Sequence, residues 1–395
     1  MSTADLTAED LGRWRQTIKG SKHWVVKFGS NVLLDKTGRL DRPTFAGLVR
    51  GLVDLGDGGR QCTLVSSGAV ALGRQLLGLE PEAQRHIPRL QALAAIGQPR
   101  LLNLYEAEFG HYQRHVAQLL FTRGDLDDRR RYLNARRAIE QVRALGALPI
   151  INENDTVATD ELRFGDNDQL AAMTAGLVGA DVLVILSDID GIYNVDIDER
   201  GERTLTTKID IIRAADPLLD EIAGPSSSGV GTGGMVTKVL AARIAARFGI
   251  PTIIAPGKLS GVIGALAAGS EVGTLLIPEP GAALVGRKVW LGAAAVPVGA
   301  LVCDAGAKRA LLEQGASLLA VGIRGVRGVF GEGDVVELLD EDGVRFGVGV
   351  TTYDSGAIEK IAGKSTEAIS EVLGYRLLDC VVHRDVLVLE PGHCK

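Results

Sequence analysis

Short apolar runs alternate with helical patterns along the chain from its start to about Pro278. Several of these runs are apolar at successive positions, as required of a strand that is covered on both faces of a sheet. The expected strands are Trp24–Phe28, Cys62–Ser66, Val116–Leu120, Leu148–Asn152, Val182–Ser187 and Thr252–Ala255. Because strands that alternate with helices form parallel sheets, the pattern predicts an α/β fold with an open, mostly parallel sheet sandwiched by helices.

The pattern changes after Pro278. From about Val296 onward the chain is rich in glycine and valine, and brief alternating segments such as Gly333–Leu338 and Val344–Val350 are separated by turns that contain Asp-Gly. Short strands of this kind predict a small β-rich second domain. The expected division is a first domain to residue 280, a linker over 281–295 and a second domain over 296–395.

A glycine cluster that runs into a helical pattern is the most informative local feature. Its ten residues are Gly229-Val-Gly-Thr-Gly-Gly-Met-Val-Thr-Lys238, and the helix is indicated by apolar residues at every fourth position, Val236, Leu240, Ile244 and Phe248. Glycines let backbone N–H groups approach an anion, a helix N-terminus adds a positive dipole end, and Lys238 adds a full charge, so the segment suits a phosphate. The lysine stands four positions beyond Gly234, so the segment is not a Walker loop, in which Gly-Lys-Ser/Thr is contiguous. By itself, a glycine-rich loop that merely turns into a helix explains the pattern equally well.

Polar clusters follow the expected strands, where an open α/β sheet binds its ligands. The clusters are Lys27–Asn31, Ser66–Ala69, the pair Asn152–Asp155 and Gly165–Asp168, and Ser187–Tyr193. Each one alone could be a simple turn, because Asn, Asp, Ser and Gly are the commonest turn residues. Together they indicate a site, because two lysines, two glycine loops and a group of amides and carboxylates all fall at strand ends. Asp and Asn oxygens also suit Mg²⁺, but nucleotide phosphates hold most of that ion in phosphoryl transfer, so we favour an organising role for these carboxylates.

Composition narrows the class of protein. With 395 residues, of which 46% are hydrophobic and 23% charged, the chain can bury a large core and divide into two or three domains. Its net charge of −6 argues against nucleic acid as the main partner. The four cysteines show neither a metal-binding nor a disulfide spacing, which fits a reducing cytoplasm. The N-terminus lacks an apolar signal core, and the longest apolar stretch, around Leu170 to Leu186, is interrupted by Asp181, so no secretory signal or membrane span is expected.

These motifs resemble the glutamate 5-kinase family of the amino acid kinase superfamily, over nearly the full length of the chain. The resemblance is carried by Val25–Ser30, Val65–Ala69, Ala95–Gln98, Ile151–Asp155, Gly165–Asp168, Ser187–Asp188, Gly191–Tyr193 and Gly231–Lys238. The second domain resembles a PUA domain, and the resemblance is carried by Asp304–Gly315, Gly347–Val350, Tyr353–Ser355, Ile361–Gly363 and His383–Asp385. The departures are small, since Ser187 and Ile192 replace an expected Thr and Leu, and residues 1–21 form an extension before the usual start. The resemblance implies the amino acid kinase fold over residues 22–280 and a PUA-like barrel after it.

The resemblance implies transfer of the γ-phosphoryl group of ATP to the side-chain carboxylate of L-glutamate, which gives L-glutamyl 5-phosphate and begins proline biosynthesis. This carboxylate, with a pKa of about 4.3, is already ionised at neutral pH, so no general base is needed. The site must instead bring two anions together, which requires positive charge and positioning.

By resemblance, Lys27 and Lys238 contact the transferred phosphoryl group from opposite sides, and Asp168 holds both ammonium groups in place. The residues expected to bind glutamate are Ser67, Gly68, Asp155 and Asn167, with Asp155 accepting from the α-ammonium group. The residues expected to bind the nucleotide are Lys27, Gly29, Ser187, Asp188, Thr232, Gly233, Gly234, Met235, Val236, Thr237 and Lys238. Among these, Gly29 and Thr232–Met235 are expected to donate backbone N–H groups to phosphates. The expected cofactors are ATP and Mg²⁺, with the metal held mainly by the nucleotide phosphates and by no protein ligand.

The resemblance also favours a homodimer or homotetramer, proline as a feedback inhibitor, functional coupling to glutamyl-phosphate reductase and a cytoplasmic location. Three alternatives stay open. An aspartate or acetylglutamate kinase is the nearest, although the paired polar segments and the second domain speak against it. An RNA-binding protein acting through the PUA-like domain is opposed by ten Lys and Arg against fifteen Asp and Glu over Val296–Lys395, a charge of −5. A nonenzymatic amino acid sensor would not need both lysines.

Overall fold

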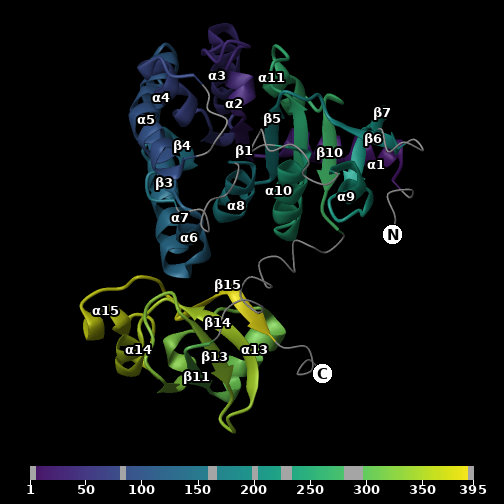
Figure 1. Ribbon diagram of the computed structural model, residues 1–395. Coiled ribbons are helices and arrows are strands. Elements are labelled where there is room, and N and C mark those ends of the chain that lie inside the picture. The colour runs from purple at the N-terminus through teal and green to yellow at the C-terminus, as the bar shows by residue number, and fades with distance from the viewer. Residues whose placement is uncertain are drawn as a thin grey trace. The chain divides into compact units, whose positions relative to one another are not determined.

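The computed structural model describes residues 6–80, 86–158, 167–197, 203–223, 234–279 and 297–389 (Figure 1). Contacts divide the chain into two compact units, one made mostly of residues 1–283 and the other mostly of residues 284–395. The predicted linker over 281–295 lies outside the described residues. Each unit has a core of its own, so the two are described separately.

The first unit is built on an eight-stranded sheet in the order β3-β4-β2-β1-β5-β9-β10-β8 (Figure 1). Its strands are β1 His23–Phe28, β2 Gln61–Ser66, β3 His115–Phe121, β4 Ala147–Glu153, β5 Val182–Ser187, β8 Ile211–Arg213, β9 Thr252–Pro256 and β10 Thr274–Ile277. The six strands from β3 to β9 in this order run parallel, whereas β10 is antiparallel to β9 and parallel to β8. These six parallel strands are the six that the sequence predicts, so the mostly parallel α/β fold is confirmed. A two-stranded hairpin, β6 Ile192–Ile197 with β7 Arg203–Ile209, forms a separate small sheet.

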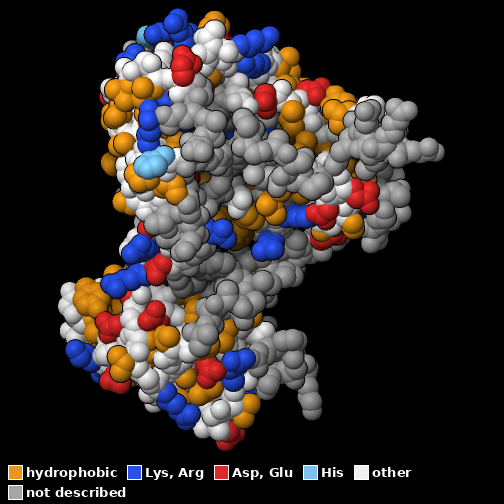
Figure 2. Space-filling model, in the orientation of Figure 1, with side chains coloured by type: hydrophobic (Ala, Val, Ile, Leu, Met, Phe, Trp, Pro, Cys, Tyr) orange, Lys and Arg blue, Asp and Glu red, His pale blue; other side chains and the backbone are white. Residues whose placement is uncertain are grey.

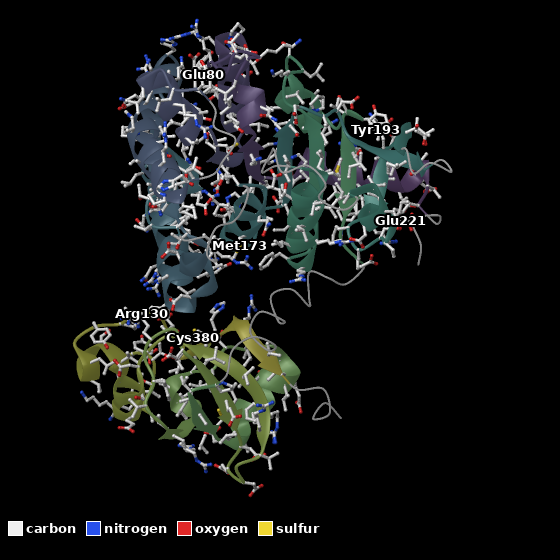
Figure 3. All side chains as sticks on the ribbon, in the orientation of Figure 1. Glu80, Arg130, Met173, Tyr193, Glu221 and Cys380 are labelled. Atoms are coloured by element: carbon white, nitrogen blue, oxygen red, sulfur yellow. The ribbon has the colours of Figure 1, made fainter. Side chains whose placement is uncertain are left out.

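Helices cover both faces of the sheet, and alternate side chains of β1 pack against different layers of helices. The helices of the first unit are α1 Ala8–Gly20, α2 Ser30–Leu33, α3 Arg42–Asp57, α4 Ala69–Leu77, α5 Ile87–Gly110, α6 Arg123–Asp127, α7 Arg129–Ala144, α8 Asn167–Val178, α9 Leu218–Ala223, α10 Met235–Arg247 and α11 Val262–Ala267. Trp24, Val26 and Phe28 join the main core with residues of α1, α3, α5 and α11. Successive strand residues point to opposite faces, so Val25 and Lys27 face the other layer, where α8 packs against β1 (Figure 3, where Met173 marks α8).

Helix α1 lies within the predicted N-terminal extension and packs into the main core. Thr7 caps the helix in a capping box with Asp10. Leu11 and Ile18 are 5% and 1% exposed and belong to the main core. The buried Arg15 donates from Nη2 to the carbonyl oxygen of Val272 at 3.1 Å. The extension is therefore an integral layer of the first unit.

Helix α10 forms where the sequence predicts a helix, but it buries a different face. The predicted apolar stripe included Leu240, which is 41% exposed. The buried positions are Lys238, Val239, Ala241, Ala242 and Ala245. Alanines leave space for α10 to pack closely against α8, and this contact brings the Lys238 side chain inward.

The second unit contains a mixed five-stranded sheet in the order β12-β11-β13-β14-β15. Its elements are β11 Gly299–Cys303, α13 Ala305–Gln314, β12 Ile323–Arg327, β13 Val335–Leu339, β14 Arg345–Thr351, α14 Ser355–Ile361, α15 Ala368–Leu373 and β15 Val382–Leu389. The predicted β-rich character is confirmed, and two strands fall where the alternating segments predicted them. The turn between them is closed by Asp340, whose Oδ1 accepts from the N–H groups of Asp342 and Val344, with Gly343 at a φ of 78°. On the face shown in Figure 2, Lys and Arg side chains of this unit lie among Asp and Glu side chains.

Among the described residues, no helix is both long and apolar enough to cross a membrane.

Candidate active site

Strand register brings the predicted polar clusters to one edge of the sheet. Phe28 at the end of β1 pairs with Ser66 of β2 on one side and with Leu186 of β5 on the other. On β4, Ile151 pairs with Val65 of β2, so the residues that follow them are also neighbours. The carboxyl ends of β4, β2, β1 and β5 therefore lie side by side, where parallel sheets place their ligand sites.

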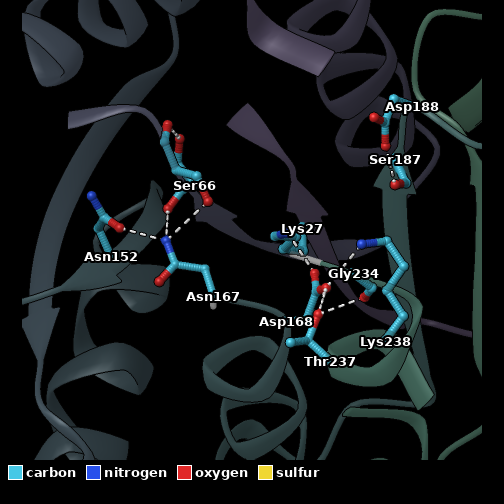
Figure 4. A network of polar contacts seen from close by, with 11 residues as sticks. Lys27, Ser66, Asn152, Asn167, Asp168, Ser187, Asp188, Gly234, Thr237 and Lys238 are labelled. Carbon is cyan, nitrogen blue, oxygen red and sulfur yellow. Dashed lines mark hydrogen bonds and ion pairs between the residues drawn. The ribbon is translucent and has the colours of Figure 1, made fainter. Parts of the chain in front are cut away.

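A buried carboxylate between two lysines lies at the centre of this edge (Figure 4). The Nζ atom of Lys27 is 2.5 Å from Oδ1 of Asp168, and that of Lys238 is 3.2 Å from Oδ2. All three are buried, with exposed fractions of 3% for Lys27, 0% for Asp168 and 4% for Lys238. Buried charges persist only when they are paired, so the carboxylate and the two ammonium groups hold one another in place.

Three separate elements deliver these charges. Lys27 is near the end of β1, Asp168 is in the first turn of α8, and Lys238 is in the first turn of α10. The hydroxyl of Thr237 lies 3.1 Å from Oδ2 of Asp168 and 2.9 Å from the carbonyl oxygen of Gly234. The N-terminus of α10 is thus tied to the same carboxylate as the two lysines.

The N-terminus of α10 also has the features of an anion site. Gly234 occupies the N-cap position and, as a glycine, offers the first turn no side-chain acceptor. A helix N-terminus whose N-cap has no side chain, together with the helix dipole, favours a bound anion. Met235 and Val236 stand in this turn. Thr232 and Gly233, which were predicted to continue the site, lie outside the described residues.

Gly29 differs from its predicted role. We expected its N–H to donate to a phosphate, but in the structure it donates to the carbonyl oxygen of Leu186 at 3.2 Å. The reason is that the hydrogen bonding between β1 and β5 continues one residue beyond the end of β1. A Cβ atom at position 29 would lie 3.3 Å from that carbonyl oxygen and 3.7 Å from Nζ of Lys27. A side chain at position 29 would therefore be in tight contact with the backbone of β5.

Asn167, next to the buried Asp168, organises a second polar group (Figure 4). Its Nδ2 atom donates to the carbonyl oxygen of Ser66 at 2.5 Å, to Oδ1 of Asn152 at 2.7 Å and to Oγ of Ser67 at 3.1 Å. Gly68 follows as the N-cap of α4 with a φ of 110°, a conformation that other residues rarely adopt. Asp155 lies partly buried in the turn that follows β4. The predicted glutamate-binding residues therefore stand at the ends of β2 and β4 and at the start of α8.

Ser187 and Asp188 lie at the end of β5, on the other side of β1. The Ser187 hydroxyl donates to Oδ1 of Asp188 at 2.9 Å, and Nδ2 of Asn31 donates to Oδ2 at 3.0 Å. Burial alone would raise the pKa of Asp188, but the hydrogen bonds from Asn31 and Ser187 outweigh it, so the pKa lies below its ordinary value. Asp188 is therefore an ionised acceptor at the edge of the site.

Several site residues received no role from the sequence. Gln98 and Asn152 lie inside the motifs that carry the resemblance, and Asn31 ends the polar cluster after the first strand, but the sequence alone could not distinguish them from their neighbours. Tyr105, whose hydroxyl is 2.7 Å from Oγ of Ser66, lies toward the C-terminal end of α5, where the local sequence gave no signal of a site. Burial raises the pKa of this tyrosine well above its ordinary value, so it serves as a neutral hydrogen-bonding partner.

Comparison with known proteins assigns the family. Residues 22–256 match the amino acid kinase family, and residues 299–373 match the PUA domain. A glutamate 5-kinase from Pseudomonas putida is 47% identical over 377 residues, which cover 95% of this chain and 100% of that protein. The chain belongs to the glutamate 5-kinase family. Other glutamate 5-kinases, from Pelobacter propionicus and Myxococcus xanthus, are 43% and 44% identical, cover 95% of this chain and are themselves covered over 99% and 98% of their length. As a member of this kinase family, the protein uses ATP.

The carboxylates at the centre of the site are engaged by other side chains of the protein. In the part of the chain that the structure describes, no group of three or more His, Cys, Asp and Glu side chains could hold a metal ion. Both oxygens of Asp168 already face lysine ammonium groups, and those of Asp188 accept from Asn31 and Ser187.

Proposed function

We propose that this protein transfers the γ-phosphoryl group of ATP to the side-chain carboxylate of L-glutamate, giving L-glutamyl 5-phosphate in the first step of proline biosynthesis. The observation that carries the proposal is the buried Lys27–Asp168–Lys238 group at the carboxyl edge of the sheet. Its setting in a chain 43–47% identical to glutamate 5-kinases supports the choice of substrate.

Electrostatics is the main demand of this reaction. The glutamate carboxylate is ionised at neutral pH and must approach an anionic phosphate, so the barrier is repulsion rather than proton removal. Two ammonium groups in a water-poor site stabilise the charge that develops as the phosphoryl group moves. Lys27 and Lys238 come from different elements, so each can reach the group from its own side, while Asp168 fixes both before substrate arrives.

Adjacent residues at the start of α8 connect two halves of the proposed site. Asp168 faces β1 and α10, where we place the nucleotide with Gly234–Lys238, Ser187 and Asp188. Asn167 faces β2 and β4, where we place glutamate with Ser67, Gly68 and Asp155. This division puts the acceptor carboxylate and the phosphoryl group on either side of one helix turn.

The proposed cofactor set is ATP with Mg²⁺. When bound, Mg²⁺ would neutralise phosphate charge as the phosphoryl group is transferred. We also propose, from the family alone, a homodimer or homotetramer, feedback inhibition by proline and functional coupling to glutamyl-phosphate reductase in the cytoplasm.

A panel of phosphoryl acceptors tests the proposal. The purified chain is supplied with ATP, Mg²⁺ and, in turn, L-glutamate, L-aspartate, N-acetyl-L-glutamate or uridylate, and ADP release is measured. We expect release with L-glutamate well above that with the other three. Folded protein that releases ADP with another acceptor and not with L-glutamate would contradict the assignment.

A further inference from the structure

Gln98 stands at the start of a chain of amide hydrogen bonds that ends in the proposed glutamate pocket. Its Oε1 atom accepts from Nδ2 of Asn152 at 2.7 Å. In turn, Oδ1 of Asn152 accepts from Nδ2 of Asn167 at 2.7 Å. Asn152 and Asn167 are 2% and 8% exposed, so water offers little replacement for these bonds.

Neighbouring backbone groups determine which side-chain atom of Asn152 and of Asn167 is the oxygen and which is the nitrogen. The N–H of Glu153 donates to the Asn152 side chain at 2.9 Å, so the atom that it meets is the oxygen. The carbonyl of Ser66 can only accept, so the atom of Asn167 that meets it is the nitrogen. The orientations of both amides follow from atoms whose roles are not in question.

Once its orientation is fixed, Asn167 can offer a ligand only one kind of contact. Its amide nitrogen has two hydrogens, and both are directed to protein acceptors on Ser66, Asn152 and Ser67. The group left for a ligand is Oδ1, which accepts and cannot donate, and Figure 4 shows it turned away from those acceptors. Of the polar groups on ionised glutamate, only the α-ammonium donates.

We propose that Gln98 is a positioning residue that holds Asn152 and Asn167 so that the pocket selects a substrate with a free α-ammonium group. The inference rests on the proposed function. Without the Gln98 acceptor, the buried Nδ2 of Asn152 has no partner, and Asn152 must turn to find one, which releases Asn167 from its orientation.

The fold around Gln98 makes it suited to this task. It follows Gly97 on α5, where an added Cβ would lie 1.8 Å from the carbonyl oxygen of Ala69 in the first turn of α4. The two helix backbones are therefore in direct contact beside the Ser67–Gly68 loop. Pro99, inside α5, comes directly after Gln98 and restricts the backbone there. The Gln98 side chain therefore extends from a rigid contact between α4 and α5, and the same contact positions the Ser67–Gly68 loop.

The test compares glutamate with glutarate, which has both carboxylates but no ammonium group. In the full-length enzyme, Gln98→Leu removes the acceptor, and Gln98→Glu keeps an oxygen for Asn152. We expect Gln98→Leu to raise the KM for glutamate about tenfold, the scale of a buried donor left without its acceptor, while the competitive Ki of glutarate changes less than about twofold. In Gln98→Glu, the ratio of the KM for glutamate to the Ki of glutarate should stay at the wild-type value or fall below it.

If Gln98 had a purely structural role, Gln98→Leu would weaken the binding of glutamate and of glutarate by the same factor. That result, or an unchanged KM for glutamate in Gln98→Leu, overturns the proposal. If Gln98→Leu does not fold, Gln98→Asn replaces it, because its shorter amide cannot reach Asn152. A wild-type enzyme without activity on glutamate would instead refute the proposed function, so the two failures are distinguishable.

Discussion

At the scale of single residues, the first unit places its charges where solvent cannot reach them. Asp168 is fully buried, and each of its oxygens faces a different lysine. Such an arrangement is costly to build, because charges leave water on folding, and it is common where catalysis needs fixed electrostatics. Elsewhere in the first unit, burial raises the pKa of Tyr105 and of Cys62, so both side chains are neutral at pH 7.

Removal of either lysine should impair phosphoryl transfer more than substrate binding. We expect Lys27→Ala and Lys238→Ala each to lower kcat about a hundredfold to a thousandfold, the usual loss for one electrostatic transition-state donor. Asp168→Asn should act by the same route, because it removes the charge that aligns both ammonium groups. Steady-state kinetics with saturating ATP measures the effect, and thermal melts confirm folding. Lys308→Ala, which removes a lysine paired with Asp340 at 2.8 Å in the second unit, is the matched control.

Substrate-binding residues should behave differently. Asp155→Ala and Asn167→Ala are expected to raise the KM for glutamate more than they lower kcat, because the Asp155 and Asn167 side chains would hold parts of the substrate that do not react.

The prediction for the lysines has a clear contrary outcome. Near-normal kcat in Lys238→Ala would rule out the two-lysine mechanism.

Thiol reactivity should report burial. Burial raises the pKa of Cys62 and of Cys303 to about 12, so both thiols are protonated at neutral pH, and the reactive thiolate forms only as the pH rises toward that value. In a Cys394→Ser variant, which removes a cysteine outside the described residues, we expect a thiol reagent to label Cys62 and Cys303 slowly in the native protein and fast in denaturant. Labelling is read by mass spectrometry. Equal rates in both states would show that these side chains are accessible.

At the scale of elements, close helix packing sets the geometry of the site. Helices α4 and α5 meet through Gly73 and Gly97, where added Cβ atoms would lie 2.0 Å from the carbonyl oxygen of Leu93 and 1.8 Å from that of Ala69. Backbone contacts of this kind cannot adjust as side chains do, so they fix the start of α4 and the loop before it.

Gly97→Ala should therefore destabilise the enzyme. We expect a loss of about 2 kcal/mol or more, since the added methyl group meets backbone atoms and forces the helices apart. Gly47→Ala in the middle of α3, where nothing lies within 4 Å of the added Cβ, should be neutral or stabilising by up to about 1 kcal/mol. Denaturant unfolding of both variants measures the difference. A Gly97→Ala enzyme as stable as the wild type would show that α4 and α5 separate easily.

At the scale of the whole molecule, each unit has the means to fold by itself. Leu301, Phe346 and Ile358 belong to a core within the second unit, whereas the described site residues all lie in the first. Helix α1 adds Leu11 and Ile18 to the core of the first unit, so the N-terminal extension belongs with it.

Removal of the second unit should leave the chemistry in place. A chain that ends before Val285 is expected to retain glutamate-dependent ATP turnover, with changes confined to regulation or assembly. The measurement is ADP release with and without glutamate, beside circular dichroism of the truncated chain. A folded truncation without activity would mean that the boundary or the site is misplaced.

The sequence by itself determined the local elements and the chemical groups of this protein. Apolar runs identified the six parallel strands because burial on both faces imposes a continuous pattern, and the apolar spacing from Val236 to Phe248 predicted the helix whose start carries Lys238. Only the tertiary structure decided which of these groups meet. Strand order brings Lys27, Asp168 and Lys238 together, although they lie far apart in the chain. Packing against α8 turned Leu240 outward, and the ladder to β5 engaged the N–H of Gly29. Such outcomes depend on which surfaces compete for burial and for hydrogen bonds, and neighbours along the chain do not carry that information.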